Sequence, residues 1–487
     1  MSSTPTSLLT SPRELVIVTR ADANVTVKDR TVTSPNFDVS SINKLLESEE
    51  DLLLSPLFGL SEERLALQAR VREEETGITP ADLTVYKRLY APDDRLEELA
   101  DRMIAEETVV GAFIKPGVAP AMWFELEPDL AAPVMTTPNF LNLQGYLNSA
   151  NEGGIDARFA WDQPGGKGAG INVIDVEGAW SFEHDDLKAN QGGLVAGRAL
   201  PQRRWRNHGT AVLGMISADE NGRGITGICP EANVSGVSVF ELQTVKGWGT
   251  AAAITQAAMK LNRGDILLLE LQRSGPAVNF KDQPEQVGCI PIEWWPDDLQ
   301  AIKFATKERG VVVVTAGGNG RQDLNSQIYD QRPPQFPVEW SNPFRRSTND
   351  SGSIIVGAGG PPTSASNLQR LQFSNFHSGN EQESIFDAQG WGQDVTTTGF
   401  GNLQNGGGPD ENFWYTGRFS GTSSAAPMIA GALACLQGIQ EARSRPRLTP
   451  SEARTRLRTT GRPQLPDPPV ERIGRRPDLR ELFESLP

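Results

Sequence analysis

The most constraining feature of the sequence is a series of short, almost wholly apolar segments separated by stretches of helical character. Helical patterns cover residues 250–262 and 297–309. Strands that are apolar along their whole length are typical of a parallel sheet covered by helices on both faces. The sequence therefore predicts an α/β fold with a doubly wound, mostly parallel sheet in residues 137–487. The apolar segments are residues 171–176, 232–240, 265–271, 311–316 and 353–358.

A smaller region precedes this part of the chain. Its pattern alternates strand, helix, strand, helix and strand, which predicts a small α+β domain over residues 13–120. Residues 1–12 are rich in Ser, Thr and Pro, and we expect a disordered tail. Prolines recur between residues 116 and 138, which favours an extended linker at residues 121–136. The expected strands are residues 14–20, 83–91 and 109–117, and the expected helices are residues 39–48 and 93–107.

Composition limits the partners and the compartment. The 487 residues include 46 Lys+Arg and 61 Asp+Glu, and the net charge of −15 argues against a nucleic-acid partner. The three cysteines are far apart in the chain, as expected of buried free thiols in a reducing compartment. No secretory signal and no apolar run near the ~20 residues of a membrane span are recognised. We therefore expect a cytoplasmic protein without a membrane partner.

Three polar residues stand in places that suit catalysis. Asp175 lies near the end of the strand at 171–176, and ligands of open α/β sheets bind at the carboxyl ends of strands. His208, in NHGTAVLGMISA, and Ser423, in RFSGTSSAAPMIAGALACL, each precede a run of small residues. A serine hydroxyl needs a neighbouring base, a neutral histidine can serve as one, and a carboxylate fixes the tautomer of that histidine.

These motifs resemble those of the subtilisin-like serine proteases, the subtilases. The resemblance covers roughly residues 137–485 and rests on VID with a following HDDL, on HGT, on AGGNG and on GTSSAAP. The chain order Asp, His, Ser is also that of subtilisin. The resemblance implies a serine endopeptidase that hydrolyses peptide bonds in protein or peptide substrates. It makes Asp175, His208 and Ser423 the catalytic residues.

The resemblance carries further expectations. Asn319, in TAGGNG, would donate to the oxyanion together with the backbone N–H of Ser423. No cofactor is required for this chemistry. His184 and His377 fall in segments that are structural in the family. In some subtilases a loop near this position binds Ca²⁺, and the oxygen-bearing residues Asp219, Glu220 and Asn221 keep a structural calcium site open.

The sequence also departs from the family pattern. The usual Asp-Thr/Ser-Gly is Asp175-Val176-Glu177 here. The usual Ser-Leu-Gly of the substrate-binding strand is replaced by a segment that begins Glu270-Leu271-Gln272. The family's specificity residues therefore do not carry over. Glu270 either lines a pocket for basic side chains or is a paired structural carboxylate, and we expect the second.

The N-terminal domain resembles a subtilase propeptide, chiefly in the stretch DDRLEELADRMIAEETVVGAFIKPG. The resemblance implies that this domain is an intramolecular inhibitor and that the chain is an autoinhibited zymogen that processes itself. The cut would fall between residues 116 and 137. A retained accessory domain that is never removed is one alternative. A catalytically silent, protease-like binding or regulatory protein is another.

Overall fold

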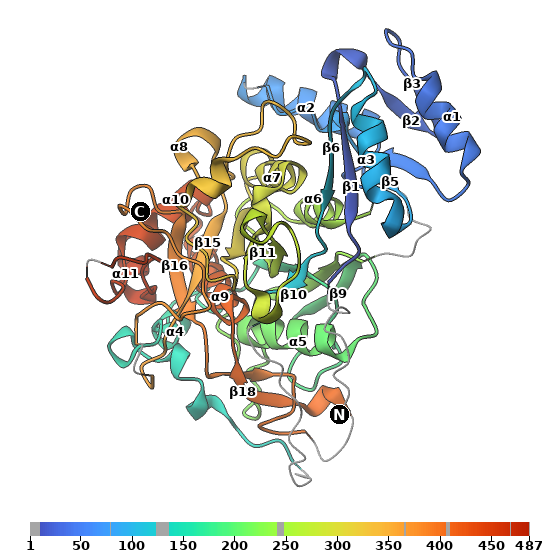
Figure 1. The fold of residues 1–487 in the computed structure, drawn as a ribbon. Coiled ribbons are helices and arrows are strands. Elements are labelled where there is room, and N and C mark those ends of the chain that lie inside the picture. Colours follow the sequence, from blue (N-terminus) through green and yellow to red (C-terminus); the bar gives the residue numbers. More distant parts are fainter. Residues whose placement is uncertain are drawn as a thin grey trace.

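The structure is a computed structural model that describes residues 10–77, 79–122, 136–240, 248–364, 367–405, 410–467 and 469–486. Most of the predicted tail and linker lies outside the described residues. Within them, a small N-terminal unit sits on a larger α/β unit (Figure 1).

The larger unit is built on a seven-stranded sheet in which every neighbouring pair of strands is parallel. The strand order is β16-β15-β14-β11-β8-β10-β9. The predicted α/β fold is thus confirmed, and two strands that the sequence analysis missed, β9 and β16, form the edges. The strands are β8 (Asn172–Glu177), β9 (Gln191–Ala196), β10 (Asn233–Ser238), β11 (Ile266–Leu269), β14 (Val312–Ala316), β15 (Ile354–Gly359) and β16 (Phe386–Trp391).

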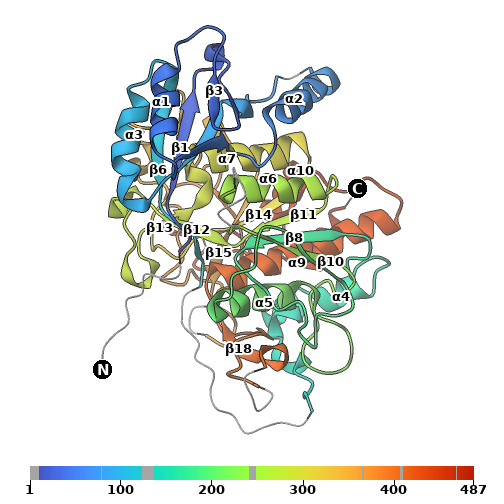
Figure 2. The same ribbon diagram turned by 90° about the vertical axis from the view of Figure 1, so that its right-hand side faces the viewer.

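Helices cover both faces of this sheet, so each strand buries side chains in two directions. Along β8, Val173 lies in the core on one face and Ile174 in the core on the other. Helices α5 (Arg203–Ser217) and α9 (Thr422–Ala442) contribute to the first core. Helices α6 (Thr250–Lys260) and α7 (Pro296–Lys303) contribute to the second core and separate the sheet from the N-terminal unit (Figure 2).

One helix in the described part of the chain, α9, has the length and composition to cross a membrane. The apolar stretch of this helix is entirely buried inside the protein. The small residues that give α9 its apolar character are those that let a helix approach the sheet closely. We therefore interpret α9 as a core helix.

The N-terminal unit is an antiparallel sheet of order β4-β5-β1-β6 with helices beside it. The strands and helices expected there are present, but the hairpin of β2 and β3, strand β4 and helix α2 were not anticipated. Helix α2 carries charges around its whole circumference and shows no clear apolar stripe. The elements are β1 (Glu14–Thr19), β2 (Thr26–Lys28), β3 (Thr31–Thr33), α1 (Ser40–Ser48), β4 (Leu53–Pro56), α2 (Glu62–Thr76), β5 (Tyr86–Tyr90), α3 (Leu96–Ile104) and β6 (Val109–Lys115).

Three further groups of elements complete the fold. After β6, strand β7 (Ala119–Pro120) joins β12 (Leu271–Ser274) and β13 (Cys289–Pro291) in a small sheet of order β13-β12-β7. A hairpin of β17 (Val395–Thr398) and β18 (Tyr415–Phe419) precedes α9. The remaining helices are α4 (Ala157–Trp161), α8 (Arg346–Asn349), α10 (Pro450–Thr459) and α11 (Leu479–Glu484).

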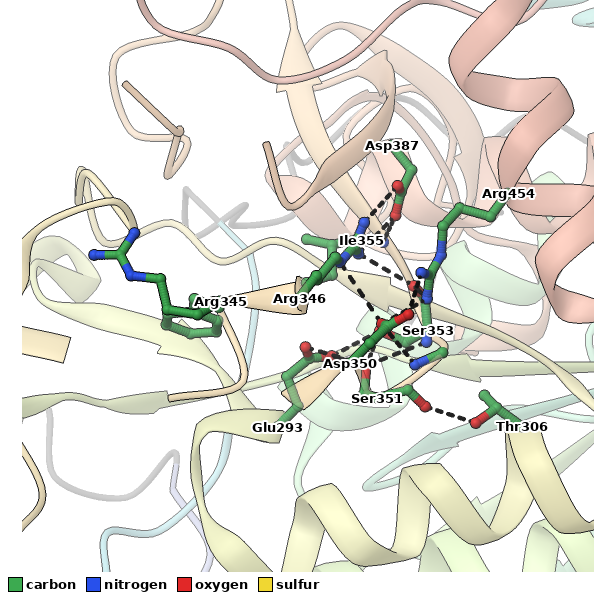
Figure 3. Close-up of polar contacts among 12 residues, drawn as sticks. Glu293, Thr306, Arg345, Arg346, Asp350, Ser351, Ser353, Ile355, Asp387 and Arg454 are labelled. Carbon is green, nitrogen blue, oxygen red and sulfur yellow. Dashed lines mark hydrogen bonds and ion pairs between the residues drawn. The ribbon is translucent and has the colours of Figure 1, made fainter. Parts of the chain in front are cut away.

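Arginine–carboxylate pairs tie α8 and α10 to the edge of the central sheet. Arg346 donates to both carboxylate oxygens of Asp387, at 2.6 and 2.8 Å, and Arg454 donates to both oxygens of Asp350, at 2.7 and 3.0 Å (Figure 3). Paired, planar contacts of this kind fix orientation as well as position. They hold the segment before β15 to strand β16 and to helix α10.

A buried ionic network joins the two units. Lys115 Nζ lies 2.9 Å from Asp298 Oδ1 and also contacts Asp297. Arg273 lies 3.2 Å from Asp298 and 3.1 Å from Glu14 of the N-terminal unit. None of these side chains is more than 4% exposed. Charges at this depth are tolerated only when each has a partner.

Lys115→Met tests this interface. Removing the lysine leaves two buried aspartates with too little positive charge, and we expect a loss of about 3–5 kcal/mol in the free energy of unfolding. The measurement is urea unfolding in the Ser423→Ala background, which keeps the expected self-cleavage from intervening. Lys44→Met, at an exposed position of α1, is the control. Equal midpoints for the two variants would contradict the prediction.

Candidate active site

His208 is held by a carboxylate, and that carboxylate belongs to Glu177. His208 lies on α5, and its Nδ1 contacts Glu177 Oε2 at the end of β8. Both side chains are completely buried. Gly209, the next residue of α5, makes room for this contact, since a Cβ there would lie 1.9 Å from Glu177 Oε1. A Cβ there would also lie 2.4 Å from the backbone carbonyl oxygen of Ala179, so the main chain as well as the glutamate requires the glycine of the HGT motif.

Asp175 lies behind this pair. Its Oδ2 accepts a 2.8 Å hydrogen bond from Trp180 Nε1, and no hydrogen bond joins it to His208 in the described residues. The sequence analysis expected Asp175 to orient His208 directly, and the structure corrects this expectation. Alternate residues of a strand point to the same side, so Asp175 and Glu177 emerge together, and the longer glutamate reaches the imidazole.

Asp175 and Glu177 are two neighbouring buried carboxyl groups. Asp175 Oδ1 and Glu177 Oε1 are both buried without a hydrogen-bond donor in the described part of the chain. The two groups interact directly, and burial together with the charge of Glu177 raises the pKa of Asp175 well above its ordinary value. Burial also raises the pKa of Glu177 well above its ordinary value, while the neighbouring Asp175 opposes this shift. A proton shared between the two carboxyls would give both of these oxygens a partner. Burial also lowers the pKa of His208 to about 3, so the imidazole is neutral.

Ser423 and Asn319 meet at the start of α9. Gly421, with φ of 109°, precedes the helix, and Ser423 stands in its first turn. Asn319 follows β14, and its Oδ1 accepts 2.9 and 3.0 Å hydrogen bonds from the N–H and hydroxyl of Thr422. Ser423 Oγ and His208 Nε2 are buried without hydrogen-bond partners among the described residues. Such bonds often form only in the reacting complex.

We call the space between β12 and the start of α9 the cleft, and the chain's own segment after β6 lies in it. Strand β7 pairs antiparallel with β12, with Pro120 opposite Leu271 and Ala119 opposite Gln272. The next residue, Ala121, presents its carbonyl oxygen to the backbone N–H of Ser423 at 3.2 Å. A Cβ at Gly421 would lie 2.2 Å from this same oxygen, so glycine is needed for the approach.

Glu270 is a third buried carboxyl beside these groups. It follows β11, whose Leu268 and Leu269 pair with Asp175 and Val176 of β8. The side chain is 0% exposed, and neither oxygen has a partner in a hydrogen bond of normal geometry among the described residues. The expectation of a paired carboxylate is thus wrong. Burial and the neighbouring Asp175 and Glu177 raise the pKa of Glu270 well above its ordinary value, while the Ser423 hydroxyl opposes this shift.

The remaining histidines lie apart from this centre. Both ring nitrogens of His184 contact the main chain, at Trp414 O and Asp186 N, which confirms the structural role expected for it. Burial lowers its pKa to about 4. His377 is also buried, and its backbone bridges to Arg472.

The proposed calcium ligands fit a cation poorly. The Asp219 carboxylate accepts from the backbone N–H of Lys188 and Ala189, and Glu220 forms an ion pair with Lys167. No group of three His, Cys, Asp or Glu side chains arranged to bind a metal occurs in the described ranges.

Sequence reasoning missed three residues of the site. Glu177 could have been suspected, because it shares a strand face with Asp175 and replaces a glycine of the family pattern. Gln272 and Gln286 gave no such signal. Each donates to the carbonyl of Pro120 in the cleft, at 3.3 and 2.8 Å, and their roles depend on loop geometry.

Known proteins resemble this chain in sequence. The family model of the subtilase family matches residues 153–474. An intracellular serine protease of Paenibacillus polymyxa is 26% identical over 312 residues, which cover 62% of this chain and 77% of that protein. The major intracellular serine protease of Bacillus subtilis is 24% identical over 302 residues, covering 60% and 76%.

Solved structures share the fold. Fervidolysin from Fervidobacterium pennivorans matches with a TM-score of 0.55 at 15% identity, over 99% of this chain and 62% of that one. This chain therefore spans less than two thirds of the length of fervidolysin. The epidermin leader peptide processing serine protease of Staphylococcus aureus matches with a TM-score of 0.53 at 16% identity, over 98% and 99%.

The raised pKa of Glu270 predicts a pH-dependent effect of Glu270→Gln. An acid whose folded pKa is raised destabilises the protein once the pH exceeds its unfolded value, ~4.3, and the cost grows until the folded pKa is passed. Relative to wild type, the variant should therefore gain stability steadily as the pH rises from 4 to 7. Unfolding midpoints at pH 4, 5.5 and 7 measure this. Glu231→Gln, at an exposed position, should show no such trend.

Proposed function

Because the chain belongs to the subtilase family of serine proteases, we propose that it is an endopeptidase in which Ser423, His208 and Glu177 act together, with Asp175 supporting Glu177. The observation that carries the proposal is the placement of a peptide carbonyl, that of Ala121, on the N–H of Ser423. A carbonyl in this position is where an oxyanion would form on attack by the serine.

The proposed step uses groups of this chain. Ser423 Oγ attacks the carbonyl carbon while His208 Nε2 takes its proton, and the carbonyl electron pair moves to the oxygen. Glu177 fixes the tautomer of His208 through Nδ1 and stabilises the imidazolium. The N–H of Ser423 and the amide of Asn319 stabilise the oxyanion. His208 then gives the proton to the leaving amine, and water later releases the acyl group by the same route. No cofactor takes part.

We further propose that the chain is an autoinhibited zymogen. Residues 119–121 lie in the cleft in the way a substrate would, and residues of the N-terminal unit are locked to the larger unit by the Lys115 network. The scissile bond is then Ala121–Met122, which lies within the interval expected from the sequence. Both residues are at most 2% exposed, so the bond is shielded from water.

The proposed setting is the cytoplasm. The two intracellular relatives and the composition favour it. A protease there must spare its host, so limited cleavage of particular protein or peptide substrates, restrained by the N-terminal unit, fits best. A catalytically silent binding protein is the alternative, and the next experiment distinguishes the two.

Self-processing is tested by the intact mass and N-terminal sequence of the purified protein. Wild type should yield a product that begins at Met122, and Ser423→Ala should remain whole. A fluorophosphonate probe should label wild type and leave Ser423→Ala unlabelled, because only the serine hydroxyl reacts. Wild type that is neither processed nor labelled, even after the linker is trimmed by another protease, would favour the silent binding protein.

A second test separates the two carboxyls. Glu177→Gln should lower kcat by about 10³–10⁴-fold, since the amide holds His208 in the wrong tautomer. Asp175→Asn should lower kcat by no more than about tenfold, because the asparagine amide can still donate to Glu177 as the protonated acid does. Peptide hydrolysis by the processed variants gives both values. An equal loss of kcat in the two variants would contradict this division of roles and would favour a direct contact of Asp175 with His208.

A further inference from the structure

The side chain of Gln286 joins the cleft segment to the oxyanion residue. Its Nε2 donates to the carbonyl oxygen of Pro120 at 2.8 Å. Its Oε1 accepts from Asn319 Nδ2 at 2.9 Å. Pro120 precedes Ala121, whose carbonyl lies on the Ser423 N–H. One amide thus contacts both the peptide in the cleft and a donor of the oxyanion site.

The hydrogen bonds fix which way each amide points. The Thr422 N–H can only donate, so the atom of Asn319 that faces it is the oxygen. The nitrogen of Asn319 therefore faces Gln286, and Gln286 must offer it an oxygen. This leaves the nitrogen of Gln286 for the Pro120 carbonyl, which can only accept. The chain of donors and acceptors has a single consistent arrangement.

Gln286 lies in a loop that is fixed by contacts with other parts of the chain. The loop connects β12 to β13, and two of its consecutive residues, Glu285 and Gln286, have φ of 54° and 59°. Residues other than glycine rarely adopt this conformation unless neighbouring contacts impose it. The contacts here are the Gly288 N–H to Gly320 O bond, at 3.0 Å, and an ion pair of Glu285 with Arg321.

A second glutamine supports the same arrangement. Gln272 Oε1 accepts from the backbone N–H of Asn319 at 2.8 Å, and Gln272 Nε2 lies 3.3 Å from the Pro120 carbonyl. Gln272 is fully buried in β12, whereas Gln286 comes from the loop. Asn319 is thus held at its main chain by one glutamine and at its side chain by the other.

We propose that Gln286 is a positioning residue of the protease, which binds the main-chain carbonyl of the substrate residue before the scissile one and thereby orients the Asn319 amide toward the oxyanion. This inference rests on the proposed function. One N–H of Asn319 Nδ2 is given to Gln286, and the other is left for the oxyanion. Any peptide has the carbonyl that Gln286 binds, so this contact recognises the extended main chain of the substrate rather than a side chain.

The proposal distinguishes the two halves of the Gln286 amide. Gln286→Glu keeps an acceptor for Asn319 and loses the donor to the substrate, so we expect KM to rise about fivefold, the value of one neutral hydrogen bond, with kcat within about threefold. Gln286→Met has nearly the same length and loses both contacts. It should also lower kcat by about tenfold, a part of the ~10²–10³ that loss of an oxyanion donor costs.

The decisive experiment is a double-mutant cycle with Asn319→Ala. A peptide with the sequence of residues 116–126 serves as substrate, and a trace of wild-type enzyme, later removed, completes processing of each variant. If Gln286 acts through Asn319, Gln286→Met should change kcat by less than about twofold once Asn319 is alanine. Gln283→Met is the matched control, because that exposed side chain donates to Lys281 O in the same loop and to no other group in the described ranges, and its kcat and KM should match wild type.

Two results would overturn the inference. One is a tenfold loss of kcat from Gln286→Met in both backgrounds, which would indicate a merely structural effect. The other is wild-type kcat and KM in both Gln286 variants. Failure of the proposed function is seen separately, as hydrolysis that persists in Ser423→Ala. Thermal midpoints within a few degrees of wild type establish that the compared variants are folded.

Discussion

The main constraint on the site is that three carboxyl groups are buried near His208 with few positive charges beside them. These are the side chains of Asp175, Glu177 and Glu270. Glu177 contacts His208 Nδ1 through one of its oxygens, and burial raises the pKa of this carboxyl as well. Asp175 accepts a hydrogen bond from Trp180, Glu270 has no partner among the described residues, and burial raises the pKa of both. The surrounding residues follow from this requirement. Trp180 donates to Asp175, and Gly209 leaves room for the larger glutamate.

The N-terminal unit is part of this balance. Strand β7, which follows its last strand β6, pairs with β12, and the carbonyl of Ala121 lies on the Ser423 N–H. The segment excludes water from the same groups whose charge states burial controls. The buried pairs of Lys115 and Arg273 then hold the segment at its other end. A single continuous stretch, from β6 to Ala121, thus links the packing of the two units to the state of the catalytic groups.

Much of the fold could be predicted from sequence because its signals are local. Five apolar segments became central strands of the parallel sheet, and the small-residue run at 422–442 became a buried helix. The edge strands β9 and β16 were missed, since Gln191–Ala196 carries two glycines and Phe386–Trp391 mixes polar and apolar residues. Edge and partly polar strands give a weaker pattern than strands buried on both faces.

The site was predictable only as far as motifs reach. The positions of His208, Ser423 and Asn319 followed from short motifs, but which carboxylate meets the imidazole depends on side-chain length and on the face of the strand. Gln286 was beyond reach for another reason. Its position depends on two residues with positive φ in a loop closed by contacts to Gly320 and Arg321, which are distant in the chain. Long-range contacts of this kind leave no periodic trace in sequence.

Release of the cleft segment would change the chemistry as well as the access. Burial lowers the pKa of His208 to about 3 while residues 119–122 fill the cleft. When water replaces this segment, the desolvation that disfavours the imidazolium is reduced, and we expect the pKa of His208 to rise toward ~6.5. A base is most effective when its pKa is near the ambient pH. In the proposed mechanism, loss of the segment therefore has two effects, because it exposes Ser423 to substrate and makes His208 a stronger base.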